Sequence, residues 1–191
     1  LYCSTERIDQ SGEIILFEIQ KDYQLLKKYS ILSKGKSTCY LTLINSEKQG
    51  IADCIASVNY WDSSVNLFNL NLDNGYLSHN PSCTYTSPGS EYVSRHNPDK
   101  YEHWQFRQKW PHTHCFVTEP YLNKYHFVAD LGRDMILCFV IKNKILKLLQ
   151  EINLEKGSGP RHIVFHPDKK ILYVINELNS TITTLLLSDK F

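Results

Sequence analysis

A strand-turn-strand pattern recurs along this chain at a nearly constant spacing. The segments "HFVADLGRDMILCFVI" (126–141) and "LYVINELNSTITTLLL" (172–187) coincide at a spacing of 172 − 126 = 46 residues. The segments "IASVNYWDSSVNLFNL" (55–70) and, with a longer turn, "LYCSTERIDQSGEIILFEI" (1–19) repeat the pattern. Short alternating runs rich in β-branched and aromatic residues are typical of strands, whereas helical periodicity is scarce. The chain is therefore predicted to be all-β and built from repeats.

A further strand precedes each later copy of the pattern. These strands are "CYLTLIN" (39–45), "HCFVTEP" (114–120) and "RHIVFHP" (161–167). A unit of roughly 40–50 residues with four short strands is typical of a β-propeller blade. An antiparallel sandwich is the alternative, but it has no reason to repeat so regularly. The segment "KNKILKLLQEINL" (142–154) could form a helix, and we predict a strand there.

The repeat divides residues 1–191 into the blades of one partial propeller domain. The strands predict part of a first blade, two complete blades and part of a fourth, at residues 1–31, 39–85, 112–153 and 161–187. A propeller avoids exposed sheet edges only by closing its ring, so about four blades are expected to be a fragment of a larger propeller. An insertion at 87–111 interrupts the rhythm and is a candidate binding loop.

Composition limits the possible partners. Lys and Arg number 21 against 20 Asp and Glu, a formal net charge of +1, which argues against the basic stripe of a nucleic-acid-binding protein. No apolar stretch reaches the roughly 18 residues of a membrane span. The six cysteines are scattered without a CxxC pair, which favours free thiols in a reducing compartment and a cytoplasmic location.

The candidate chemistry lies at the starts of the innermost strands, which line the central channel of a propeller. Alignment of the repeats places Cys39, His114 and Arg161 at equivalent positions, so a His and an Arg are expected side by side at the channel mouth. Taken singly, His114 is better explained as a capped histidine and Arg161 as the partner of a carboxylate. His112 and His114 share a strand face, but no third ligand stands at a recognisable spacing, and no metal site is predicted.

Three segments carry a family resemblance. "GPRHIVFHPDKKILYVINELNSTI", "PHTHCFVTEPYLNKYHFVADLGRDMI" and "IASVNYWDSSVNLF" resemble consecutive blades of the seven-bladed β-propeller lactonase family. That family includes propeller-type 6-phosphogluconolactonases and carboxymuconate-lactonizing enzymes. The resemblance covers nearly the whole chain and is strongest from 107 to 187. It implies a seven-bladed propeller of which this sequence contains about the first four blades.

The resemblance also implies the residues of a site. A His, two Arg and a Glu form the site proposed for the lactonizing branch, and three of these fall on His114, Arg161 and Glu177. The second Arg belongs to a later blade than this sequence contains. Tyr40 stands where the family more usually has a histidine. Three neighbouring residues are expected to bind substrate, namely His112, His162 and Asn176.

The implied reaction is hydrolysis of a sugar lactone in the pentose phosphate pathway, with 6-phosphogluconolactone as the leading candidate substrate. His114 would accept a proton from water, Arg161 would hold the substrate's anionic group or the growing oxyanion, and Glu177 would orient Arg161 or the water. No cofactor is required, and the partner is a phosphorylated sugar lactone bound by a monomer. A muconate-type lactonizing enzyme and a non-catalytic binding propeller are the alternatives.

Overall fold

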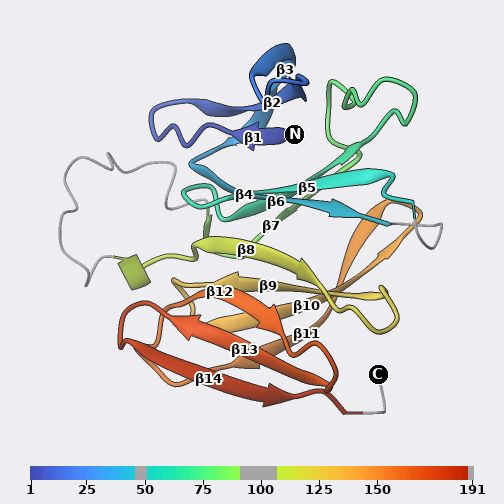
Figure 1. The fold of residues 1–191 in the computed structure, drawn as a ribbon. Coiled ribbons are helices and arrows are strands. Elements are labelled where there is room, and N and C mark those ends of the chain that lie inside the picture. Colours follow the sequence, from blue (N-terminus) through green and yellow to red (C-terminus); the bar gives the residue numbers. More distant parts are fainter. Residues whose placement is uncertain (46–50, 91–106, 189–191) are drawn as a thin grey trace.

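The computed structural model describes residues 1–45, 51–90 and 107–188. These residues form four antiparallel sheets and contain no α-helix. The sheets follow one another in chain order from the blue to the red end of the ribbon (Figure 1). Their strands are β1 (Tyr2–Ser4), β2 (Ser11–Ile19) and β3 (Leu25–Lys36); β4 (Thr38–Ile44), β5 (Cys54–Asn59), β6 (Ser64–Asn69) and β7 (Cys83–Thr86); β8 (Thr113–Thr118), β9 (Tyr125–Asp130), β10 (Met135–Lys142) and β11 (Ile145–Asn153); and β12 (Pro160–Phe165), β13 (Ile171–Asn176) and β14 (Thr181–Leu186).

Each sheet is a meander in which consecutive strands pair. The strands predicted from the repeat are present, and the segment that could have been a helix is strand β11, paired with β10. The all-β propeller fold predicted from the repeat is confirmed. In the first sheet, β3 continues to Lys36, beyond the predicted end at 31, because Ser33 is buried and donates from its hydroxyl to the carbonyl of Gly12.

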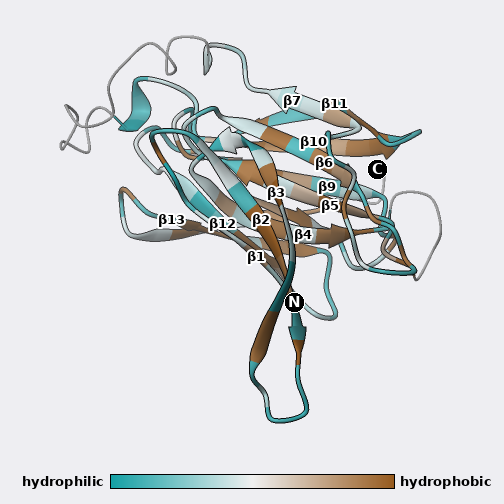
Figure 2. Ribbon diagram, turned by 90° about the horizontal axis from the view of Figure 1, so that it is seen from above, coloured by the Kyte–Doolittle hydropathy of each residue, from teal (hydrophilic) through white to brown (hydrophobic). Residues whose placement is uncertain are grey.

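The first strands of successive sheets lie beside one another. Strand β8 contacts both β4 and β12, as expected of inner strands around a shared axis. Figure 2 shows the hydrophobic strands stacked in the centre, with the tip of the β2–β3 hairpin extending away from them. His114, on β8, and Arg161 and His162, on β12, therefore stand on inner strands of the fold.

The core fills the spaces between neighbouring sheets. One cluster joins the second and third sheets through residues such as Val58, Phe116 and Phe139, and a second joins the third and fourth sheets through residues such as Phe127 and Val174. The side chains of Phe116, Phe127 and Phe139 are almost fully buried, and each such burial stabilises the fold by about 1.5–3 kcal/mol. This packing fixes β8 between its neighbours and so fixes the side chains at its start.

Candidate functional site

A β-bulge stands at the start of each of three inner strands. The pairing registers shift between Thr38 and Tyr40, between Thr113 and Cys115, and between Pro160 and His162. The extra residues are Cys39, His114 and Arg161, which confirms the equivalence predicted from the repeat. A bulge leaves one residue out of the ladder and re-aims its side chain, and bulges often occur beside active sites.

The three residues predicted to be catalytic meet in one chain of polar contacts. Nε of Arg161 donates a hydrogen bond to Nε2 of His114 over 2.9 Å. Nη1 of Arg161 lies 3.0 Å from Oε2 of Glu177 and forms an ion pair with it. His114 comes from β8, Arg161 from β12 and Glu177 from the turn after β13. Arg161 and Glu177, which both come from the fourth sheet, thus meet beside His114 of the third sheet.

Arg107 is a fourth member of this group, and sequence reasoning missed it. Its Nη1 donates to Oε1 of Glu177, and its Nε donates to the hydroxyl of Tyr60 over 3.1 Å. Arg107 lies in the insertion at 87–111, which was predicted to be a binding loop, but nothing in the repeat singles this residue out. Residues 91–106 of that insertion, with Trp104, lie outside the described part of the chain.

The other two histidines differ in their surroundings. His112 is fully buried and stacks on Tyr60, with ring centroids 4.3 Å apart and an angle of 5° between the planes. Nδ1 of His112 also lies 3.1 Å from the carbonyl oxygen of Tyr60. His162 is exposed and meets the ring of His114 edge to face at 5.1 Å, with Tyr40 behind it at 6.1 Å. His162 is therefore the histidine beside His114 that solvent reaches.

Asn176 is engaged within its own sheet. Its Nδ2 donates to the hydroxyls of Thr181 and Thr183 over 2.9 and 2.8 Å. The equivalent Asn59 and Asp130 are likewise buried and bonded, Asn59 to a threonine hydroxyl and Asp130 to the backbone N–H of His112. A substrate-binding role for Asn176 stays a prediction. Its contacts resemble those of the buried polar residues that end β5 and β9, Asn59 and Asp130.

His114 is neutral at physiological pH. Burial, followed by the charges of Arg161 and His162, lowers its pKa to about 4. Because Arg161 donates to Nε2, the proton of the neutral ring resides on Nδ1, which is buried without a hydrogen-bond partner among the described residues. Burial likewise lowers the pKa of His112 to about 4.

Glu177 is ionised in this setting. Partial burial raises the pKa of Glu177, but the hydrogen bond from Arg107 and the charges of Arg107 and Arg161 outweigh that effect, and the pKa lies below its usual value. Two guanidinium groups then face one carboxylate and a neutral imidazole. The group as a whole carries one net positive charge.

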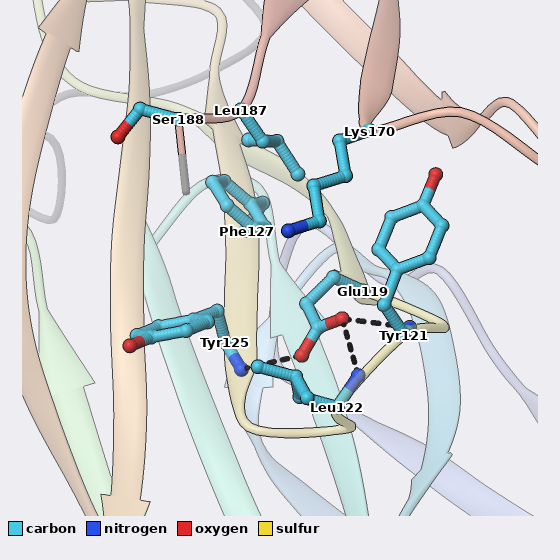
Figure 3. A pocket seen from close by; sticks show the side chains of 8 residues that line it. All are labelled: Glu119, Tyr121, Leu122, Tyr125, Phe127, Lys170, Leu187 and Ser188. Carbon is cyan, nitrogen blue, oxygen red and sulfur yellow. Dashed lines mark hydrogen bonds between the residues drawn. The ribbon is translucent and has the colours of Figure 1, made fainter. Parts of the chain in front are cut away.

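The pocket in Figure 3 lies elsewhere, beyond the C-terminal end of β8. It has a volume of about 140 Å³ and lies between Phe127, Lys170 and Leu187. Glu119, on its wall, accepts hydrogen bonds from the backbone N–H groups of Tyr121 and Leu122 (Figure 3). This carboxylate shapes a turn, and the cavity shares no residue with the group around Glu177.

The described residues hold no cluster of three or more metal-ligating side chains. Within the same residues, no helix is both long and apolar enough to cross a membrane.

Gly132 holds the segment that leads into β8 close to the β9–β10 turn. A Cβ at this position would lie 1.8 Å from the carbonyl oxygen of Trp110 and 3.0 Å from the backbone nitrogen of His112. We expect Gly132→Ala to lower the free energy of unfolding by about 1–3 kcal/mol, the usual cost of overpacking, because backbone atoms must shift. Chemical denaturation measures this loss, and an unchanged free energy would contradict the close approach.

Comparison with known proteins places the fold and the group of side chains in context. The family described as "Lactonase, 7-bladed beta-propeller" matches residues 1–190. The 6-phosphogluconolactonase of Bacillus subtilis is 28% identical over 183 residues, which cover 95% of this chain and 47% of that protein. Crystal structures of putative 6-phosphogluconolactonases from Bacteroides uniformis and Bacteroides fragilis superpose with TM-scores of 0.77 and 0.75 at 27% and 29% identity. The superposition covers 98% of this chain and 50% of the Bacteroides uniformis protein, and 100% of this chain and 51% of the Bacteroides fragilis protein. This chain thus spans about half the length of these relatives. The chain belongs to the seven-bladed β-propeller lactonase family.

Proposed function

We propose that the protein hydrolyses a sugar lactone, 6-phosphogluconolactone, at the group formed by His114, Arg161 and Glu177. The observation that carries this proposal is the continuous set of contacts from the histidine through the arginine to the carboxylate, at the bulged starts of two inner strands. Its relatives in Bacillus subtilis and Bacteroides bear the name of this activity. Six free thiols fit a protein that acts in a reducing, cytoplasmic compartment.

The chemistry begins with Arg161. Attack of water on the lactone carbonyl places negative charge on the carbonyl oxygen, and a guanidinium in a partly buried site stabilises that charge. In the structure, Nε–H of Arg161 points at His114, and Nη1 forms an ion pair with Glu177. When Arg161 turns its Nε–H toward the substrate oxygen, Nε2 of His114 is left free to accept a proton.

His114 then acts as the base. Its neutral ring takes a proton from the attacking water while the oxygen–carbon bond forms. Collapse of the tetrahedral intermediate breaks the ring C–O bond, and the imidazolium returns the proton to the departing alkoxide. Glu177 retains Arg161 near the reaction by its ion pair. The product is the open-chain hydroxy acid, and the reaction needs no redox step.

A binding propeller without catalysis is the second candidate, and one observation favours it. The acceptor nitrogen of His114 is occupied by Arg161, and a pKa of about 4 makes this imidazole a weak base. Such a protein would bind the lactone by the same cations and release it unchanged.

An assay of lactone hydrolysis separates the two candidates. Proton release from 6-phosphogluconolactone in weak buffer near pH 6.5 gives the rate above the spontaneous reaction, and muconolactone serves as the comparison substrate. We expect turnover of the phosphorylated sugar lactone with a clear preference over muconolactone. Binding seen by calorimetry together with a rate equal to the spontaneous one would reject hydrolysis and leave the binding propeller.

A further inference from the structure

Two guanidinium groups share the single carboxylate of Glu177. Oε1 of Glu177 accepts a hydrogen bond from Arg107, and Oε2 pairs with Arg161 at 3.0 Å. The two cations repel each other, and one carboxylate balances only one of them. An anion that enters between them therefore gains from a charge that the protein leaves uncompensated.

Both arginines keep donors available for such an anion. Arg107 uses Nε and Nη1 for Tyr60 and Glu177, and Arg161 uses Nε and Nη1 for His114 and Glu177. Within the described residues, Nη2 of each arginine has no hydrogen-bond partner. The side chains are 33% and 46% exposed, so solvent reaches both. Forked N–H donors of this kind fit the oxygens of a phosphate group.

The two arginines have different neighbours, and we infer different roles for them from these contacts. Arg161 touches His114, the proposed base, and so belongs to the reacting carbonyl. Arg107 contacts Tyr60 on its other side, with the guanidinium carbon 5.8 Å from the ring centroid. Tyr60 is itself held by its stack on the buried His112. Arg107 is thus a cation fixed on a rigid support, one carboxylate away from the reaction.

We propose that Arg107 is a specificity-determining residue that binds the phosphate of a phosphorylated sugar lactone. The identity of the substrate rests on the proposed function. The lactone carbonyl and ring are uncharged, so the phosphate is the only anionic group of this substrate, and it carries a charge of roughly −1.5 to −2 at pH 7. Because Arg107 is separate from Arg161, the protein can bind this phosphate through Arg107 while Arg161 stabilises the negative charge on the carbonyl oxygen.

Binding measurements on the full chain test this role. Isothermal titration calorimetry with 6-phosphogluconate, gluconate and inorganic phosphate is compared for the wild-type protein, Arg107→Gln and Arg107→Lys. We expect Arg107→Gln to weaken binding of 6-phosphogluconate and inorganic phosphate by about tenfold or more and to leave the affinity for gluconate unchanged, since hydrogen bonds between an arginine and a phosphate are charge-assisted and stronger than neutral ones. Arg107→Lys keeps the charge without the fork and should fall between the two.

Arg133→Gln is the matched control. It removes the same charge from an arginine that pairs with Glu151 at 3.2 Å, outside the group around Glu177, and it should change none of the affinities. Equal losses for gluconate and 6-phosphogluconate in Arg107→Gln would overturn the proposal, because Arg107 would then only support Glu177 and Tyr60. Unchanged binding of every ligand would overturn it as well.

The outcome is distinguishable from failure of the proposed function. Phosphate binding that depends on Arg107 in a protein without lactone turnover would support this inference and reject hydrolysis. Lactone turnover with the same KM for 6-phosphogluconolactone in wild type and Arg107→Gln would reject this inference and leave hydrolysis standing.

Discussion

Replacing His114 with alanine is expected to lower kcat/KM for 6-phosphogluconolactone by about 10²-fold or more, the usual scale for the loss of a general base. The ring of His114 accepts a hydrogen bond from Arg161, so its removal takes away both the proton acceptor and one anchor of the arginine. Initial rates of proton release, measured over the spontaneous reaction, give the effect.

The control for this change is His79→Ala. His79 is exposed in a turn, so its removal should leave the rate within experimental error of wild type. The pH dependence adds a second readout: kcat/KM should fall on the acid side around pH 4, where His114 takes up its proton, and Arg161→Gln should move this midpoint upward because the charge of Arg161 lowers the pKa. Activity of His114→Ala within a few-fold of wild type would remove His114 from the mechanism.

The fold could be predicted because a blade is a local unit. Each sheet consists of consecutive strands, so a pattern read over about 45 residues contains all its pairings. The spacing between His114 and Arg161 equals one repeat, and both proved to be bulged residues of inner strands. Their contact follows from the repeat and from the neighbouring positions of β8 and β12.

The rest of the site could not be predicted in this way. Glu177 entered only through the family resemblance, because a glutamate in a turn is by default solvated. Arg107 reaches Glu177 across 70 residues of sequence from an insertion that has no counterpart in the other blades. No periodic pattern marks such a contact. The roles of His112, His162 and Asn176 in substrate binding stay predictions.

Acid should destabilise this protein steeply between about pH 6.5 and pH 4. Burial lowers the pKa of His112, His114 and His126 to about 4 in the folded state, against 6.5 for an unperturbed histidine. Groups whose folded pKa is depressed in this way bind protons first in the unfolded chain, so stability present above pH 6.5 is lost as the pH falls. Asp130 acts in the opposite direction, because burial raises its pKa and the folded state keeps that proton longer.

With three histidines at a folded pKa of about 4, the unfolded chain binds nearly three protons more than the folded protein near pH 5, and these histidines alone lower the free energy of unfolding by roughly 3–4 kcal/mol per pH unit. Guanidinium chloride denaturation at pH 7, 6 and 5 measures this slope. His126→Gln, at a position outside the proposed site, should reduce the slope by about one proton, which is about 1.4 kcal/mol per pH unit. A free energy of unfolding that stays constant from pH 7 to pH 5 would show that the buried histidines are charged in the folded protein, and His114 could not then begin the reaction as a neutral base.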